Sequence, residues 1–224
     1  MIHETEFRFD IDPILEQFSM MPEFGKRLTL NETNGNLLTG RYTVKPEYQG
    51  TPLGDVLKAL DDIGEARLLK LESAECYTAH CDPDDRYDMV ITTNPHCYLI
   101  DIEKQKMHQL PVDGRIWRLD TSIRHTAVNF GSRDRVYLNI RHRLPLFESP
   151  GYHLRFSGGD FDWKQVLYED TMKMLNTKIK SKEITGIEKI NDLEIRLNCS
   201  RDTIDYIKTN AESKGFTVEI NFLG

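Results

Sequence analysis

The sequence contains no Cys-x-x-Cys pair, no cysteine spacing typical of a disulfide framework and no long apolar run. Its four cysteines, Cys76, Cys81, Cys97 and Cys199, are therefore predicted to be reduced thiols. The first residues lack the basic start and apolar core of a secretion signal, and no stretch is long enough to span a membrane. These absences argue against a secreted or membrane-spanning protein, and we expect a cytoplasmic one.

An excess of positive charge, internal repeats and low-complexity segments are also missing. The 29 Lys and Arg residues are outnumbered by 36 Asp and Glu residues, which gives a net charge of −7. Binding to nucleic acid depends on clustered Lys and Arg, so this balance argues against it. The length of 224 residues, with 39% hydrophobic residues, suits one soluble domain with a small appendage. No feature of the sequence specifies an oligomeric state.

Short strand-like segments separated by turns dominate the middle of the chain. They are expected at 67–71, 89–93, 97–101, 115–119, 125–130 and 135–143. Before them, Phe7–Ile11 alternates like a strand and Asp12–Phe18 indicates a short helix. A second helix has Thr51 as N-cap and Pro52 at its first position, and Gly64 is predicted to end it. This pattern predicts a mainly β sandwich or jelly-roll barrel with flanking helices, over residues 1–150.

Residues 151–224 are predicted to form a small helical and α+β appendage. Asp162–Gln165 resembles a capping box that starts a helix. Its apolar residues on one face are Trp163, Val166, Leu167, Met174 and Leu175. A strand at 193–197, a helix capped by Ser200 and a final strand at 216–222 after Gly215 should follow. The lysines at 173, 178, 180, 182 and 189 are interpreted as a solvated helix end, with a binding patch as the alternative.

Two histidines and an aspartate lie at positions that could form one metal site. His80 and Asp82 are two positions apart in an apparent strand, 77–82, so their side chains should share a face and reach one ion. His125 begins another apparent strand. Two imidazoles and one carboxylate form a facial triad that leaves open positions on a ferrous ion. A zinc site is the weaker alternative, since no Cys-x-x-Cys pair is present among its candidate ligands, which are Cys76, His80, Cys81, His96 and Cys97.

A cation follows the second histidine at a fixed distance. Arg135 lies ten positions after His125, beyond the turn at 131–134, and a hairpin is expected to bring it near the metal. Its face of the strand would also carry Tyr137 and Asn139. An arginine fork there could hold a carboxylate with two hydrogen bonds. Arg86 could meet a cosubstrate or substrate carboxylate, or form a surface salt bridge with Asp84 or Asp88.

The segments Tyr77–Asp82, Trp117–Gly131 and Arg135–Leu138 resemble the aspartyl/asparaginyl β-hydroxylase family of 2-oxoglutarate oxygenases, which includes free-proline cis-hydroxylases. The resemblance covers roughly residues 66–145. It implies a double-stranded β-helix, the cupin-like jelly roll, with Fe(II) held by His80, Asp82 and His125. It also implies that Arg135 binds the distal carboxylate of 2-oxoglutarate. The aspartyl β-hydroxylases proper lack the acidic ligand, so Asp82 makes this chain similar to the branch with a full triad.

The activity implied by this resemblance is hydroxylation of an amino acid, free or in a peptide. O2 and 2-oxoglutarate would be cosubstrates, with ascorbate as a candidate reductant. Two alternatives stand beside it. One is a non-catalytic jelly-roll module that binds a metal or small anion. The other is a hydroxylase that modifies a macromolecule recruited through the C-terminal appendage.

Overall fold

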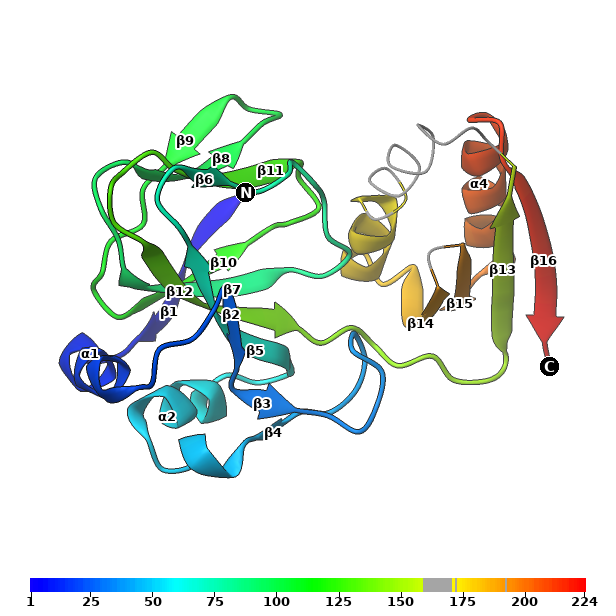
Figure 1. Cartoon of the computed structure of the whole chain (residues 1–224). Coiled ribbons are helices and arrows are strands. Elements are labelled where there is room, and N and C mark those ends of the chain that lie inside the picture. The colour runs from blue at the N-terminus through cyan, green and yellow to red at the C-terminus, as the bar shows by residue number, and fades with distance from the viewer. Residues whose placement is uncertain (159–170, 172, 192) are drawn as a thin grey trace.

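The computed structural model describes residues 1–158, 171, 173–191 and 193–224. Figure 1 shows two neighbouring parts: a β-barrel coloured blue to green, and a C-terminal sheet with helices coloured yellow to red. Among the described residues, no helix has the length and apolar composition needed to cross a lipid bilayer.

Two antiparallel sheets form the barrel. The larger sheet has the order β1 (Ile2–Arg8), β10 (Arg115–Leu119), β7 (Arg86–Thr92), β12 (Arg135–His142), β5 (Ile63–Leu71) and β2 (Arg27–Thr29). The smaller sheet has the order β6 (Glu75–Cys76), β11 (His125–Asn129), β8 (Cys97–Asp101) and β9 (Lys106–His108), and β3 (Asn31–Glu32) pairs separately with β4 (Thr43–Val44). The protein therefore has the mainly β jelly-roll fold predicted from its sequence.

The alternation of side chains along β12 separates a hydrophobic core from a polar interior. Val136, Leu138 and Ile140 are buried in the core on the outer side of the larger sheet. Tyr137 and Asn139, between them in sequence, line a cavity inside the barrel. The predicted division of this strand into two faces is thus confirmed, and it leaves the inner face free for polar chemistry.

Helices α1 (Ile11–Met20) and α2 (Pro52–Ala59) cover the outer side of the larger sheet, with a short 3-10 helix, η1 (Pro46–Tyr48), before α2. The side chain of Asp10 accepts a hydrogen bond from the backbone of Asp12, and that of Thr51 accepts one from Gly54. Each N-cap satisfies an amide that has no partner within its helix. The residues Ile14, Leu53, Val56 and Leu57 bring both helices into the core of this sheet.

Two predicted boundaries are wrong. The first strand ends at Arg8, because Asp10 caps α1 and Ile11 is already helical. Helix α2 ends at Ala59, and Gly64 lies inside β5 instead of ending the helix. A side chain at Gly64 would have its Cβ 3.1 Å from the Cβ of Arg141, so this glycine permits close approach of β5 and β12.

The C-terminal part contains two strands that the sequence analysis did not predict, β13 (Gly151–Ser157) and β14 (Ile184–Asn191). They join β15 (Glu194–Cys199) and β16 (Thr217–Leu223) in an antiparallel sheet of order β14-β15-β13-β16. Residues 173–180 are helical, and α4 (Arg201–Glu212) is capped by Ser200 as predicted. Strand, helix, strand, strand, helix, strand is the split β-α-β arrangement of ferredoxin-like folds.

Part of the predicted C-terminal helix lies outside the described residues, including the capping box 162–165 and Trp163, Val166 and Leu167. The described remainder packs as expected, since Leu175 is fully buried and Met174 packs against the same core. That core also contains Leu38 and Leu144 from the barrel side of the chain. Apolar packing therefore crosses residue 150, and the domain division at that position stays a prediction.

Candidate metal centre

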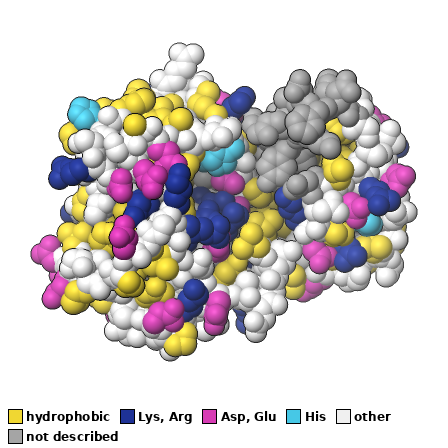
Figure 2. Space-filling view, viewed as in Figure 1, with side chains coloured by type: hydrophobic (Ala, Val, Ile, Leu, Met, Phe, Trp, Pro, Cys, Tyr) yellow, Lys and Arg dark blue, Asp and Glu magenta, His cyan; other side chains and the backbone are white. Residues whose placement is uncertain are grey.

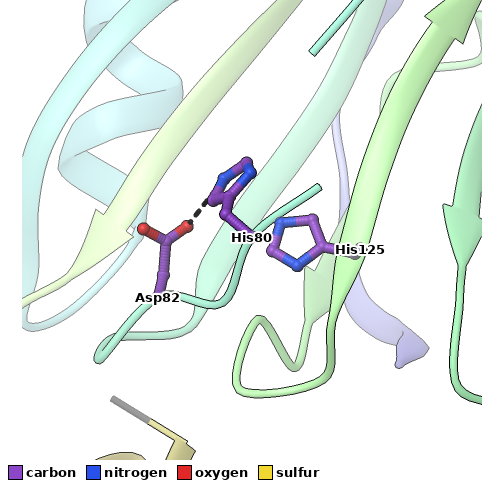
Figure 3. Close-up of side chains that lie close together, drawn as sticks. All are labelled: His80, Asp82 and His125. Carbon is purple, nitrogen blue, oxygen red and sulfur yellow. Dashed lines mark ion pairs between the residues drawn. The ribbon is translucent and has the colours of Figure 1, made fainter. Parts of the chain in front are cut away.

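Three side chains from two distant segments converge at one end of the barrel interior. His80, Asp82 and His125 each offer a ligand atom, and these atoms lie within 4.8 Å of one another (Figure 3). Within the described ranges of the chain, this is the one group of His, Cys, Asp and Glu residues with such spacing. Two imidazoles and a carboxylate match the donor set of a ferrous site with open positions.

Backbone hydrogen bonds hold the two histidines beside each other. The amide of His80 donates to the carbonyl of His125, and the amide of His125 donates to the carbonyl of His80, both at 3.0 Å. The ring centroids are 4.6 Å apart. The two segments thus form an antiparallel bridge at the position where the ligands are needed.

The predicted continuous strand over 77–82 is wrong, although its ligands do converge. Strand β6 covers only Glu75–Cys76, and His80 forms an isolated bridge. Tyr77 bonds to Ala127 and His80 to His125, so three steps of one segment lie against two steps of the other. Such an extra residue interrupts the ladder in the manner of a bulge and changes the direction of the following side chains.

Each histidine is oriented by a carbonyl in its own loop. Nδ1 of His80 lies 2.7 Å from the Thr78 carbonyl oxygen, and Nδ1 of His125 lies 2.8 Å from that of Ile123. Because a carbonyl only accepts, Nδ1 must donate in both cases. A neutral ring then carries its lone pair on Nε2, and Nε2 of His80 is the atom that faces Asp82, at 3.6 Å.

The charges around the cluster favour an ionised aspartate. Burial acts to raise the pKa of Asp82, but the positive charge of Arg86 and the hydrogen bond with His80 outweigh it and hold that pKa below its usual value. The hydrogen bond with Asp82 raises the pKa of His80, whereas burial lowers the pKa of His125. An ionised carboxylate beside imidazole nitrogens attracts a divalent cation.

Arg86 is committed to two aspartates. Its Nη2 lies 3.2 Å from Oδ1 of Asp82, and its Nη1 pairs with the carboxylate of Asp84. The Asp84 pairing was one of the two partners expected for this arginine, but the contact is buried and not at the surface. Since Asp82 presents Oδ2 to His80 and Oδ1 to Arg86, the arginine orients the carboxylate.

A cavity of about 320 Å³ opens beside the cluster and is lined by all three of its members. Figure 2 shows a hollow near the centre of this face, with Lys and Arg side chains inside it and a histidine at its rim. Sequence reasoning missed four charged residues of the lining, Lys26, Arg27, Arg67 and Asp88. Strand alternation could have identified Arg67, because the neighbouring Ala66 and Leu68 belong to the outer core.

Arg135 is only 4% exposed and is not among the residues that line this cavity. Its guanidinium carbon is 4.6 Å from the ring centroid of Tyr137, which lines the cavity. Within the described part of the chain, no carboxylate lies within ion-pair distance of its guanidinium. A buried cation without an acidic partner is costly unless an anion joins it.

The hairpin predicted between His125 and Arg135 is wrong. Strand β11 pairs with β6 and β8, whereas β12 pairs with β5 and β7 in the other sheet. The turn after β11 therefore carries the chain across the barrel. Arg135 and His125 still face the same interior, because the inner sides of both sheets meet there.

Cysteine contributes nothing to the cluster. None of the four cysteines forms a disulfide, as predicted; Cys81 and Cys97 are buried and Cys76 is exposed. Asn129 is fully buried, and its amide donates to the carbonyls of Leu71 and Arg133. It holds the turn that follows β11.

The site is a jelly-roll barrel with two histidines and an aspartate in its interior, a donor set suited to a metal ion. Residues 53–145 match the sequence model of the family described as aspartyl/asparaginyl beta-hydroxylase. This segment is therefore similar to the aspartyl/asparaginyl β-hydroxylase family, as its sequence predicted. No curated protein matches the chain.

Solved structures with some similarity include a prolyl-4-hydroxylase of Pseudomonas putida. It is 13% identical, the match covers 63% of this chain and 91% of that one, and the TM-score is 0.42. A sugar phosphate isomerase of the cupin superfamily from Silicibacter pomeroyi DSS-3 is 19% identical over 59% of this chain and 85% of that one, with a TM-score of 0.30.

Proposed function

We propose that this protein is an Fe(II)- and 2-oxoglutarate-dependent dioxygenase that hydroxylates an amino acid, free or in a peptide. The observation that carries the proposal is the convergence of His80, Asp82 and His125 on one point of a cavity. The family match over 53–145 supports the same class. The proposed location is the cytoplasm, and ascorbate is the proposed reductant.

The residues would hold the metal and leave space beside it. His80 and His125 would each bind through Nε2, since Nδ1 is occupied by a backbone carbonyl. Asp82 would bind through Oδ2, the oxygen directed toward His80, while Arg86 retains Oδ1. Bound iron would supply oxygen activation, coupled to conversion of 2-oxoglutarate into succinate and CO2, with one oxygen atom entering succinate and the other the substrate.

Arg135 is the proposed partner of the far carboxylate of 2-oxoglutarate. Its burial and the missing acidic partner among the described residues support this role. Tyr77 and Tyr137 line the cavity near this position and would exclude water from the pair. A carboxylate-guanidinium pair in such surroundings is stronger than on the surface.

The test is succinate release by the purified protein with Fe(II), ascorbate, 2-oxoglutarate and air, with and without a panel of amino acids and peptides. His125→Ala should abolish succinate release, because the metal loses an imidazole ligand. His96→Ala is the matched control, since His96 is exposed and lies outside the cluster. Mass spectrometry for the gain of one oxygen would identify the substrate.

A non-catalytic metal-binding module is the second candidate, and the same triad would serve it. It differs in one result: the module would bind Fe(II) but release no succinate with any member of the panel. Equal succinate release by wild type and His125→Ala would remove the assignment of His125 as a ligand.

A further inference from the structure

The helical segment 173–180 of the C-terminal part is joined to the barrel by ion pairs. Its residues Lys173, Asn176 and Lys180 are spaced so that they lie on one face of a helix. Lys180 Nζ lies 2.8 Å from Oδ1 of Asp85 and 2.9 Å from Oδ1 of Asp120. The lysines are partly solvated, as predicted for this helix end, but Lys173 and Lys180 also pair with acidic residues of the barrel, which the sequence did not predict.

The two aspartates bound by Lys180 belong to the two loops that carry the metal ligands. Asp85 follows Asp82 by three residues, and Asp120 precedes His125 by five. Thr121 connects the loops: its carbonyl accepts a hydrogen bond from the amide of Asp82 at 2.8 Å, and its hydroxyl donates to the Asp84 carbonyl at 2.5 Å. The ammonium group of Lys180 therefore bridges two loops that are also joined by the hydrogen bonds of Thr121, next to the three metal ligands.

The Asp85 side of the contact is buried, whereas Lys180 and Asp120 are 36% and 28% exposed. Asp85 is 5% exposed and Asn176 is 2% exposed, and the Asn176 amide donates to Oδ1 of Asp85 at 3.3 Å. Oδ2 of the same carboxylate accepts from Nε and Nη2 of Arg118, at 3.1 and 2.9 Å. Removing Lys180 would leave charge on Asp120 and Asp85 without this shared partner, so both loops could relax away from each other.

We propose that Lys180 and Asn176 are positioning residues for the metal centre: the C-terminal part clamps the loops of Asp82 and His125 into the arrangement that binds the ion. Neither residue contacts the ligand side chains themselves, so their effect passes through the loop backbone. Groups that orient metal ligands typically change metal affinity by ten- to a hundredfold. The inference rests on the proposed function only in that the three ligands bind a metal.

The test compares Lys180→Met with wild type in full-length protein, with Lys180→Arg as rescue. Lys208→Met is the matched control, because Lys208 pairs with Glu212 on the surface of α4. Titration of the metal-free proteins with Co(II), followed by its absorption, should show a dissociation constant raised roughly tenfold in Lys180→Met. Lys180→Arg should recover most of the affinity, and Lys208→Met should match wild type.

Hydrogen exchange in the metal-free proteins gives a second measurement. Amides in 80–86 and 119–125 should exchange faster in Lys180→Met than in wild type, whereas amides of β5 and β12 should not change. A lower melting temperature with unchanged exchange in these loops would reduce the contact to ordinary stability and overturn the clamp.

The outcomes separate the clamp from the proposed function. A wild type that binds no Co(II) would refute the metal site, and hydrogen exchange would still decide whether Lys180 orders the loops. If Lys180→Met binds Co(II) as tightly as wild type does, the clamp is refuted but the metal site is not. Loss of succinate release without a change in metal affinity would also count against it.

Discussion

At the scale of single residues, the site combines an aspartate that is kept ionised with an arginine that lacks an acid. Arg86 and His80 hold the pKa of Asp82 below its usual value, whereas Arg135 is buried against Tyr137. The two arginines thus differ in role, because Arg86 already has two carboxylate partners. Arg135, by contrast, has no carboxylate within ion-pair distance among the described residues, and its charge acts on Asp88 only at longer range.

Arg135→Met should weaken binding of 2-oxoglutarate by roughly a hundredfold, because a buried charge-assisted pair worth about 3 kcal/mol is lost. Co(II) affinity should stay near the wild-type value, since Arg135 is not a ligand. Binding of 2-oxoglutarate to the Co(II) protein, measured calorimetrically, checks this, and Arg133→Met at an exposed turn position is the control. An affinity within twofold of wild type would assign the cosubstrate carboxylate to another cation.

Asp88 gives a pH-dependent prediction. Burial raises the pKa of this carboxyl from 3.8 to about 6, although Asn139 donates a hydrogen bond to it. The folded state therefore binds the proton more tightly than the unfolded chain, and the contribution of Asp88 to stability falls as pH rises from about 4 to about 6. Asp88→Asn should remove this loss and gain about 2–3 kcal/mol of stability at pH 7.

Urea unfolding of wild type, Asp88→Asn and the exposed control Asp61→Asn between pH 4 and pH 7 measures the effect. Burial lowers the pKa of His142 from 6.5 to about 4, so its contribution has the opposite sign and rises with pH over a similar range. It is present in all three proteins and cancels in their difference. If the free energy of unfolding changes with pH in the same way for wild type and Asp88→Asn, burial does not raise the pKa of Asp88 and the prediction is wrong.

At the scale of elements, local patterns predicted strands and caps well and pairings poorly. Strands β8 and β10 have the predicted bounds, and Thr51 caps α2 as expected. These features depend only on residues close in sequence. The strands follow from alternating apolar and polar residues, and the cap follows from a hydroxyl beside a backbone amide that has no partner within the helix. The hairpin of β11 and β12 failed because a turn between two strands is also compatible with a crossing from one sheet to the other.

Strand β13 and strand β14 were missed for a different physical reason. In β13 the buried residues Leu154 and Phe156 alternate with His153 and Arg155, but the pattern is short and follows Pro150. In β14 the register shifts between Ile184 and Gly186, so its apolar residues do not keep a strict period of two. Both strands are stabilised by their neighbours β15 and β16 more than by their own pattern.

At the scale of the whole molecule, the barrel and the C-terminal part share a hydrophobic core. Leu38 and Leu144 lie in the cluster that contains Leu154, Leu197 and Ile204. A chain cut after residue 185 would lose most of β14 together with β15, α4 and β16, and would expose those two leucines. Truncation is therefore unsuited to test whether the C-terminal part recruits a macromolecule, because packing would be lost at the same time.

Leu38→Ala should destabilise the protein by about 2–3 kcal/mol, because a 9% exposed side chain is removed from this shared core. Leu37→Ala is the adjacent control, since Leu37 is 48% exposed and should cost under about 0.5 kcal/mol. Chemical unfolding gives both values, and hydrogen exchange should accelerate in β15 and α4. Equal costs at the two positions would show that the barrel does not support the C-terminal core.

The sequence by itself determined the jelly-roll class, the family over residues 53–145 and the residue types able to form a metal site. These follow from patterns along the chain: alternating strands, a His-x-Asp tripeptide, a second histidine and an arginine ten positions later. Tertiary structure decided how these groups meet, because their contacts join segments whose sheets and loops are distant in sequence. The buried pairs of Arg86, the unpaired Arg135 and the Lys180 bridge depend on such packing, which no local pattern specifies.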